Sequence, residues 1–363
     1  MNVGILTFHC AHNYGAVLQT YALQEFLKEN GHQVDVIDYR PEYLVKQYRT
    51  DDPSESLWRR LIRLPLIPLR ILRHKRFESF IASNFSLSQY GASRKCIGKH
   101  YDAYVLGSDQ IWNSNITKGD LTFFGGFDRA SNSLLISYAA STEVPHEGAS
   151  LDFSAEKEHL RKFTSLSVRE DALREQIQPL VDTTVCTVVD PTLLVDPIVF
   201  DRVATREKSV GYVLIYQVNI FANTIPIAKK IQEAKKIRHR IKLVPRITKA
   251  ELLNSYSAAS PERFVGLFKG AEYVVTSTFH GTVFAIICKK QFVCVLSKTR
   301  GNYRILSILK NLGLENRMVY SLNDIPEEPI DYDAVLLKLD VLRKASKSFL
   351  LSALNSEGKS AIA

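Results

Sequence analysis

The fold of this chain is decided by the stretch AEYVVTSTFHGTVFAII, residues 271–287. It contains an apolar strand, then hydroxyl side chains, one histidine, one glycine and the start of a helix. In α/β proteins this order presents unpaired backbone N–H groups and a titratable side chain to an anion. The stretch therefore predicts an α/β fold and a negatively charged ligand.

The order of strand, polar turn and helix recurs along the chain. Val3 to Phe8 is predicted as a buried strand, Gly15 to Glu29 as a helix that stops at Gly31, and Val34 to Asp38 as the next strand. Such a βαβ unit is parallel and right-handed. Periodicity predicts further strands at 101–109, 134–141, 166–170, 210–218, 241–244, 274–277 and, as the last, 292–296, with helices at 172–177, 225–237 and 262–269.

These elements predict two Rossmann-like domains that face each other across a cleft. A chain of 363 residues is too long for one ordinary core. We expect an N-terminal α/β domain over 1–197, a C-terminal Rossmann-like domain over 198–330, and helices within 331–363 that pack back on the first domain. Ligands of parallel sheets gather at the carboxyl ends of strands. We therefore expect one crowded rim made of Asn13, Asp109, Ser141 and Arg169.

Composition and cysteine usage exclude several classes of protein. With 45% hydrophobic and 23% charged residues, the chain has an ordinary globular composition, which argues against disorder. The five cysteines are scattered and odd in number, which argues against a disulfide framework. No second group at ligand spacing accompanies His9, Cys10 and His12, so no metal is expected. Met1 to Leu6 lacks signal-peptide features, and no apolar run approaches the roughly 20 residues of a membrane span, so we expect a cytoplasmic protein.

A basic, amphipathic segment lies within an insertion at 54–80. The chain carries a formal charge of +9, and seven arginines and lysines between Leu57 and Phe77 alternate with apolar residues around Pro65 and Pro68. This composition is typical of helices that rest on an anionic membrane surface. The alternative is that two short helices cover the core and leave their arginines in solvent. Nucleic acid is not an expected partner.

His280 has the strongest local context for binding an anion. It stands where a strand gives way to a helix whose first amides are unpaired, and Gly281 allows close approach of the backbone. A phosphate there would meet amide donors and an imidazole. The alternative is that the histidine merely caps the turn.

Arginines provide further candidates for anion binding. Arg169 ends a predicted strand, where its guanidinium can hold a carboxylate through two hydrogen bonds. A plain ion pair with Glu170 or Asp171 is the alternative. Arg300 and Arg304 follow the strand at 292–296, in a loop that can reach the same cleft.

Asp109 and Trp112 are candidates for binding a sugar. The Asp109 carboxylate follows a predicted strand, where it can take a hydroxyl proton or hydrogen-bond a diol. The nearby indole of Trp112 can stack on the face of a sugar. Asp109 could instead cap a short helix. Asn13 to Gln19 contains one glycine and matches neither Gly-x-Gly-x-x-Gly nor Gly-Lys-Ser/Thr, so no nucleotide cofactor is expected.

Taken together, four ordered segments resemble the polysaccharide pyruvyltransferase family. They are Asn13 to Gln19 (NYGAVLQ), Gly107 to Asn113 (GSDQIWN), Ser167 to Glu170 (SVRE) and Phe279 to Thr282 (FHGT). The resemblance implies a GT-B-like fold and transfer of a pyruvyl group from phosphoenolpyruvate to a sugar diol, giving a cyclic ketal during capsule or exopolysaccharide biosynthesis. It implies no cofactor beyond the donor substrate.

The resemblance also implies roles for particular residues. Arg169 and His280 would bind phosphoenolpyruvate, and Thr278 and Gly281 beside His280 are further candidates for binding it. Some relatives have arginine where this chain has Thr278, so Arg304 or Arg300 would supply the missing charge. For the acceptor the candidates are Asn13, Tyr14, Gln19, Asp109 and Trp112.

In the mechanism that we predict, Asp109 is the general base for the acceptor and His280 neutralises or protonates phosphate oxygens. The acceptor sugar is open, and the basic segment favours a lipid-linked acceptor at the inner face of the membrane. Two alternatives remain: a GT-B glycosyltransferase that uses a nucleotide-sugar, because fold does not fix function, and a non-catalytic capsule-assembly protein.

Overall fold

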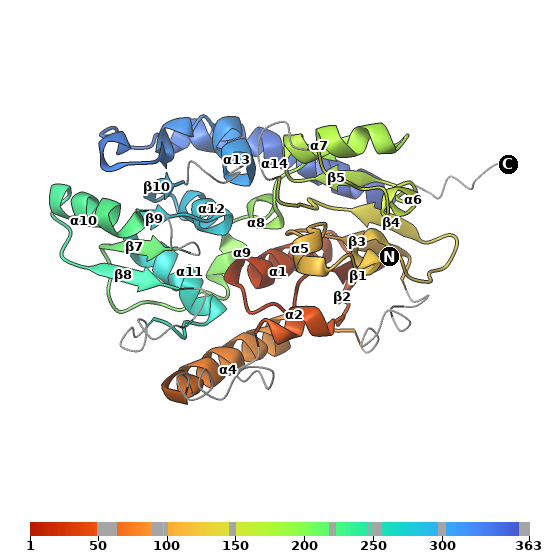
Figure 1. Cartoon of the computed structure of the whole chain (residues 1–363), viewed down its shortest axis with the longest axis horizontal. Coiled ribbons are helices and arrows are strands. Elements are labelled where there is room, and N and C mark those ends of the chain that lie inside the picture. The colour runs from red at the N-terminus through yellow and green to blue at the C-terminus, as the bar shows by residue number, and fades with distance from the viewer. Residues whose placement is uncertain are drawn as a thin grey trace.

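The structure is a computed structural model that describes residues 1–48, 64–88, 97, 101–144, 150–217, 223–244, 247, 256–296 and 303–355. It consists of two lobes that lie side by side (Figure 1). Each lobe is built on a parallel sheet with helices packed against it.

The N-terminal lobe has the strand order β2-β1-β3-β4, which β5 and β6 extend. All of these pairings are parallel, and isolated bridges from Ile136 to Ser165 and from Ala140 to Val168 join β4 to β5. The strands are β1 (Asn2–Leu6), β2 (Gln33–Val36), β3 (Ala103–Leu106), β4 (Leu134–Ser137), β5 (Leu166–Val168) and β6 (Val185–Thr187). The helices of this lobe are α1 (Tyr14–Glu29), α2 (Glu42–Lys46), α4 (Ile67–Asn84), α5 (Ser114–Thr117), α6 (Lys157–Leu160) and α7 (Asp171–Ile177), with short 3₁₀ turns η1 (Leu64–Leu66), η3 (Leu121–Phe124) and η4 (Gln178–Leu180).

The C-terminal lobe has the strand order β11-β10-β9-β7-β8, again parallel throughout. Its strands are β7 (Tyr212–Tyr216), β8 (Arg240–Leu243), β9 (Ala271–Thr276), β10 (Gln291–Val295) and β11 (Met318–Val319). Its helices are α9 (Ile198–Asp201), α10 (Thr224–Ala234), α11 (Pro261–Gly270), α12 (Phe279–Ile287) and α13 (Tyr303–Leu312), with 3₁₀ turns η6 (Glu315–Arg317) and η7 (Leu322–Asp324). The prediction that the strand near 292–296 is the last was wrong, because β11 pairs beside it. Two residues are too few to produce a periodic pattern.

In both lobes the strand order reverses direction next to the first strand. The reversal lies between β1 and β3 in one lobe and between β7 and β9 in the other. Open α/β sheets bind ligands at such switch points, beyond the carboxyl ends of the strands. The topology confirms the predicted fold class, α/β with two Rossmann-like domains in a GT-B-like arrangement. Segments with the sequence motifs follow strands β1, β3 and β9 at these switch points.

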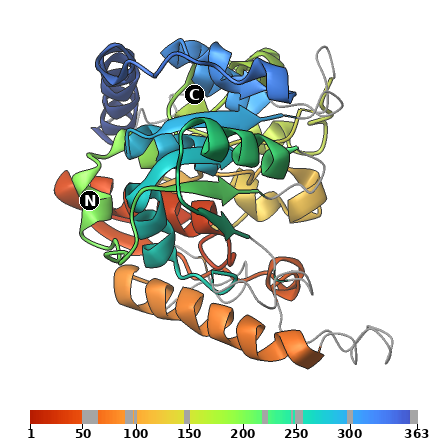
Figure 2. The same ribbon diagram turned by 90° about the vertical axis from the view of Figure 1, so that its left-hand side faces the viewer.

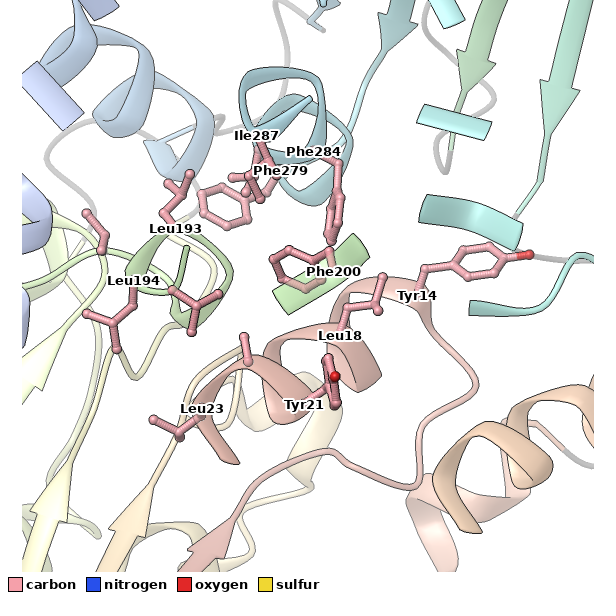
Figure 3. Close-up of a cluster of buried hydrophobic side chains, with 14 of the residues drawn as sticks. Tyr14, Leu18, Tyr21, Leu23, Leu193, Leu194, Phe200, Phe279, Phe284 and Ile287 are labelled. Atoms are coloured by element: carbon pink, nitrogen blue, oxygen red, sulfur yellow. The ribbon is translucent and has the colours of Figure 1, made fainter. Parts of the chain in front are cut away.

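A shared hydrophobic core holds the lobes together. It runs without interruption from strand residues of the first sheet to strand residues of the second. Figure 3 shows its central part, where side chains of α1 meet those of α8 (Pro191–Leu194), α9 and α12: Tyr14, Leu18, Tyr21, Leu23, Leu193, Leu194, Phe200, Phe279, Phe284 and Ile287. Phe200 and Phe284 pack edge to face with ring centroids 5.1 Å apart. Apolar packing of this kind fixes how the two helix starts, at α1 and α12, face each other.

Two long helices cross between the lobes. α14 (Tyr332–Asn355) contacts α13 of the C-terminal lobe and also reaches the segment before α9, where Arg343 Nε donates to Leu193 O at 2.8 Å and Ser346 Oγ accepts from Val189 N at 3.0 Å. α4 runs along one edge of the molecule beside α11 (Figures 1 and 2). The expected domain boundary at 197 falls between α8 and α9.

The arginines of α4 do not lie on the free surface that the pattern of the basic segment predicted. Arg70, Arg73 and Arg76 lie three residues apart on one helix face and donate to backbone carbonyls of the C-terminal lobe, at Ile247, Ser257 and Ala258 respectively. Arg73 is buried and also donates to Val244 O and to the Tyr14 hydroxyl. These three side chains join the lobes. The remaining insertion residues, 54–63, lie outside the described residues.

None of the helices in the described part of the chain is both long and apolar enough to span a bilayer.

Candidate active site

The turn after β3 brings a carboxylate to the rim of the N-terminal lobe. Gly107 has φ +129 and no room for a Cβ, which would overlap the carbonyl of Tyr138. Asp109 follows in the left-handed region with φ 68, an uncommon conformation for a residue other than glycine that often marks a functional site. Its backbone O accepts from Ser141 N at 3.0 Å, and its Oδ1 accepts from Gln110 N at 2.8 Å. The second carboxylate oxygen makes no hydrogen bond with any described residue.

Arg169 lies at the end of β5 and is fully enclosed. Its Nε donates to Glu170 Oε1 at 2.9 Å, its Nη1 to Asp190 Oδ2 at 2.8 Å and its Nη2 to the Ser141 hydroxyl at 2.9 Å. The guanidinium carbon lies 4.1 Å from the centre of the Phe279 ring, on α12 of the other lobe. The ion pair with Glu170 that was the alternative to ligand binding is therefore present. A guanidinium has five N–H donors, so two remain after these three bonds.

Asp190 is the centre of the cluster, and the sequence did not single it out. It is buried just after β6, where its Oδ1 accepts from Thr192 N at 3.0 Å and caps α8. Its Oδ2 accepts from Arg169 and from the Ser108 hydroxyl at 3.1 Å. His280 Nε2 lies 3.6 Å from the same oxygen. One carboxylate thus connects β3, β5 and α12.

The ionisation of this cluster follows from its burial and pairing. Burial disfavours the Asp190 carboxylate, but His280 and Arg169 outweigh burial and hold the pKa of Asp190 well below its ordinary value. Burial also opposes the charge of Arg169, yet Glu170 and Asp190 raise the pKa of that guanidinium. For Glu170 burial dominates and raises its pKa in spite of Arg169.

The start of α12 places His280 against the first lobe. Thr278 is the N-cap, and its hydroxyl accepts from Gly281 N at 2.9 Å. A Cβ on Gly281 would overlap the Thr276 hydroxyl, so glycine is required for this close turn. The His280 side chain is 12% exposed, and a Cβ on Gly15 of α1 would overlap its Nδ1. The two helix starts therefore touch at His280 and Gly15.

Three polar atoms in this region lack a partner among the described residues. Glu170 Oε2, Ser277 Oγ and His280 Nε2 are buried and make no hydrogen bond with any described residue. Buried polar groups are nearly always hydrogen-bonded, so an orphaned group calls for an explanation. Glu170 and His280 flank the same Arg169–Asp190 pair, which indicates a site that binds a polar ligand.

A pocket opens beside Arg169 between the lobes. It has a volume of about 60 Å³ and is lined by the residues Arg169, Thr187, Val188, Val189, Asp190, Phe279, Arg304, Ser307, Ile308, Asn311, Leu342, Ala345 and Ser346. Arg304, at the start of α13, makes no hydrogen bond or ion pair with any described residue. Burial lowers the pKa of Arg304, and the charge of Arg169 lowers it further. Two arginines facing one pocket repel each other unless an anion lies between them.

A model of the polysaccharide pyruvyl transferase family matches residues 13–299 of the chain. The chain belongs to the polysaccharide pyruvyl transferase family. The match confirms the family that the four sequence segments indicated. No curated protein matches the chain.

This pyruvyl transferase family member is similar to several solved structures. The UDP-GlcNAc 2-epimerase of Neisseria meningitidis, bound to UDP-GlcNAc, is similar with a TM-score of 0.48 and 10% identity, covering 98% of this chain and 99% of that chain. For the UDP-GlcNAc 2-epimerase of Methanocaldococcus jannaschii the TM-score is 0.47, again at 10% identity over 98% and 99% of the two chains. The E. coli heptosyltransferase WaaC with ADP has a TM-score of 0.38 and 12% identity over 94% of this chain and 100% of that chain.

The structure brings together several of the predicted site residues of this family member. Asp109, Ser141 and Arg169 form the crowded rim that the strand ends predicted, as their hydrogen bonds show. His280 and Arg169 both face Asp190 Oδ2. Asn13 caps α1 by accepting from Gly15 N at 2.9 Å, and it stands two residues before Gly15, which contacts His280. Arg300 lies outside the described residues.

Three residues predicted to bind the acceptor are buried structural residues in this family member. Tyr14 is fully buried, donates to Ala259 O and stacks on Phe264. Trp112 donates its indole N–H to Phe123 O and stacks on Phe124, so neither ring face is open to a sugar. Gln19 is also buried, and its amide bonds Thr7, Ala16, Thr20 and Ser108. Tyr14 and Gln19 lie in α1 and Trp112 lies in the turn after β3, and all three side chains point into the protein interior.

Proposed function

We propose that this chain transfers the pyruvyl group of phosphoenolpyruvate to two hydroxyls of a sugar, forming a cyclic ketal and releasing phosphate. Family membership supports pyruvyl transfer in general. The observation that carries the donor assignment is the pair of arginines, Arg169 and Arg304, that line one pocket between the lobes. Phosphoenolpyruvate has a carboxylate and a phosphate, and two guanidinium groups suit both.

The donor would be held chiefly by Arg304. This guanidinium has all its donors free of other described residues, whereas Arg169 can offer only the two N–H groups that its carboxylate and hydroxyl partners leave. His280 and the unpartnered Ser277 hydroxyl lie at the start of α12, where helix amides favour a phosphate. In this proposal Arg169 is held in place mainly by Asp190 and orients the donor. Arg304 supplies the positive charge that some relatives have at the position of Thr278.

The chemistry balances without a further reactant. Protonation of the methylene carbon of the donor makes the enol carbon electrophilic, and one sugar hydroxyl adds to it. The second hydroxyl then displaces phosphate, which closes the ketal ring. One hydroxyl proton replaces the proton taken up by carbon, and the other leaves with phosphate. Asp109, with one carboxylate oxygen free of described partners, is the proposed base for the acceptor.

A direct test uses the purified protein with phosphoenolpyruvate and a panel of free and lipid-linked sugars. We expect phosphate release that depends on one sugar, together with a product whose mass has increased by one pyruvyl ketal. Asp109→Asn should abolish turnover but retain donor binding. Release of a nucleotide from a nucleotide-sugar, without phosphate from phosphoenolpyruvate, would instead establish the glycosyltransferase alternative. No turnover with any donor would favour a non-catalytic assembly protein.

We further propose that the acceptor is lipid-linked and that the protein works at the inner face of the cell membrane. Three arginines of α4 bond the other lobe, and the exposed surface of η1 and α4 includes apolar side chains. Leu64 in η1 and Ile71 and Leu72 in α4 are 53%, 41% and 40% exposed, and Lys75 of α4 is also exposed. Apolar side chains next to a lysine suit shallow insertion into an anionic bilayer. In liposome flotation, Ile71→Glu with Leu72→Glu should lower recovery with anionic vesicles. Equal recovery of variant and wild type would contradict this proposal.

A further inference from the structure

A cluster of two histidines and one glutamate lies where α4 meets the loop before α1. His12, in the loop after β1, is buried, and its Nε2 lies 2.9 Å from Glu78 Oε1. His74 is exposed, and its ring centroid is 4.7 Å from that of His12. His74 and Glu78 are four residues apart on α4, so they share one helix face. One ligand atom from each of the three lies within 4.8 Å of the other two.

These separations are close to those of a filled metal site. Zinc bonds to histidine nitrogen and carboxylate oxygen are about 2.0–2.1 Å, so two ligand atoms of a tetrahedral site lie roughly 3.4 Å apart. The observed separations, from 2.9 Å for one pair to 4.8 Å at most, bracket that value. Because His74 is exposed and makes no hydrogen bond with a described residue, rotation of its side chain is enough to close the site.

The surroundings orient the carboxylate and balance its charge. Glu78 Oε2 accepts from Arg40 Nη1 at 3.1 Å, and Arg40 Nε donates to Asp38 Oδ1 at 2.6 Å. Asp38 also pairs with His9 Nε2 at 2.8 Å. Two carboxylates therefore face a single arginine, and with neutral imidazoles the group has one net negative charge. Outer partners that hold a carboxylate ligand in place are typical of metal sites.

We propose that His12, His74 and Glu78 bind a divalent transition-metal ion of the zinc class, with a fourth position open to water. Ions of this class prefer a ligand set of two imidazoles and one carboxylate, whereas magnesium and calcium prefer oxygen ligands. The sequence argued against a metal at His9, Cys10 and His12 because no second ligand group follows nearby. The second group comes from α4, 62 to 66 positions further along the chain.

The position of the site gives the ion a mechanical role. His12 is followed at once by Asn13, which caps α1, and α4 carries the arginines that bond the C-terminal lobe. A bound ion would cross-link the loop before α1 to α4 and thereby fix the junction between the lobes. This inference does not depend on the proposed reaction.

The test is titration of the chelator-treated full chain with Co²⁺, followed by displacement with Zn²⁺. We expect one equivalent of Co²⁺ to give the visible absorption of a four-coordinate site, Zn²⁺ to remove it, and either metal to raise the Tm. His74→Ala should weaken binding at least about tenfold, as expected when one of three protein ligands is lost. His74 is exposed, so this variant should retain the unfolding transition of the metal-free wild type.

His32→Ala is the matched control, because this histidine stands at the opposite, amino end of β2. It should bind Co²⁺ as the wild type does. If His74→Ala and Glu78→Gln both bind Co²⁺ with unchanged affinity, or if the wild type gives no four-coordinate spectrum, His12 and Glu78 form only a hydrogen bond and the proposal is wrong.

Discussion

Two arginines at the junction of the lobes differ in what surrounds them. Arg169, at the end of β5, is bonded to two carboxylates and one hydroxyl, and its side chain is 2% exposed. Arg304, at the start of α13, lines the same pocket and bonds to no described residue. A cation that already has its anions contributes to the structure. Arg304 makes no hydrogen bond or ion pair with a described residue and is repelled by Arg169, so its donors are available to an anion from outside.

The comparison separates two roles that the sequence could not distinguish. Both arginines were predicted to bind phosphoenolpyruvate, because a guanidinium near a strand end fits either a ligand or a protein carboxylate. The partners of Arg169 are Glu170, next in sequence, and Asp190, which is 21 positions away. The difference predicts opposite effects of removing each charge on stability and on binding.

The largest effect is expected from Arg169→Met. Removing this guanidinium leaves the buried carboxylates of Asp190 and Glu170 without their cation, and such losses cost about 3–5 kcal/mol of unfolding free energy. Urea unfolding at neutral pH would measure the loss. Arg202→Met is the matched control, because Arg202 is 51% exposed in its pairs with Glu25 and Glu29 and should cost at most about 1 kcal/mol. Equal losses in the two variants would mean that the Arg169 cluster is not buried as described.

Arg304→Ala should show the reverse pattern. We expect the unfolding free energy to change by at most about 0.5 kcal/mol, since no bond within the described protein is lost and the repulsion from Arg169 is relieved. Affinity for phosphoenolpyruvate should fall roughly 10- to 100-fold, the equivalent of one or two hydrogen bonds to a charged group. Calorimetric titration of the donor measures this, and Arg304→Lys should recover part of the affinity. Unchanged donor affinity in Arg304→Ala would remove Arg304 from the site.

The parts of this site that the sequence predicted are those with a local signature. The strand, turn and helix at 271–287 appear as β9 and α12, and Thr278 caps the helix through Gly281. Likewise, hydrophobic strands with polar ends at 101–109, 134–141 and 166–170 place Asp109, Ser141 and Arg169 together. Parallel strands share a carboxyl edge, so the ends of neighbouring strands meet whatever the length of the connections between them.

The parts that failed depend on distant segments. Tyr14 and Trp112 lie in motifs at the cleft, but which way a side chain points from a turn is set by packing across it. At Asp190 the sequence predicts only a linker, because Asp-Pro-Thr is typical of a turn, and the fold alone brings Arg169 and His280 to it. The arginines of α4 show the same limit, since an amphipathic pattern does not tell solvent from another lobe.

Substitutions at the contact between the starts of α1 and α12 test whether His280 is fixed in place, as Arg169 is. In Gly15→Ala the added Cβ overlaps the imidazole of His280, so one of them must shift, and overpacking of this kind costs roughly 1–2 kcal/mol. In a His280→Ala background the same substitution should cost less than about 0.5 kcal/mol, because the clashing ring is gone. The difference between the two costs is the coupling energy of the pair. Additive effects would show that the helix starts separate in solution.

The smallest effect concerns a third arginine, Arg40, which pairs with Asp38 and Glu78. Each of these three side chains is 32% exposed. For Glu78, the hydrogen bond from His12 and the charge of Arg40 overcome burial and lower the pKa to about 2. Because the folded pKa lies below the unfolded value of about 4.3, the stabilisation is present above that value and is lost as the pH falls toward 2.

Glu78→Gln removes this titration, so its unfolding free energy should fall less steeply than that of the wild type between pH 4.5 and about 2.5. Exposure of the pair limits the difference to about 1 kcal/mol, well below the effect at Arg169. Urea unfolding in metal-free buffer at several pH values measures it. Glu42→Gln is the matched control, since Glu42 is 69% exposed in its pair with Lys46 and should leave the slope unchanged. Parallel curves for wild type and Glu78→Gln would mean that Glu78 titrates alike in the folded and unfolded chain, and that the His12 and Arg40 contacts do not persist in solution.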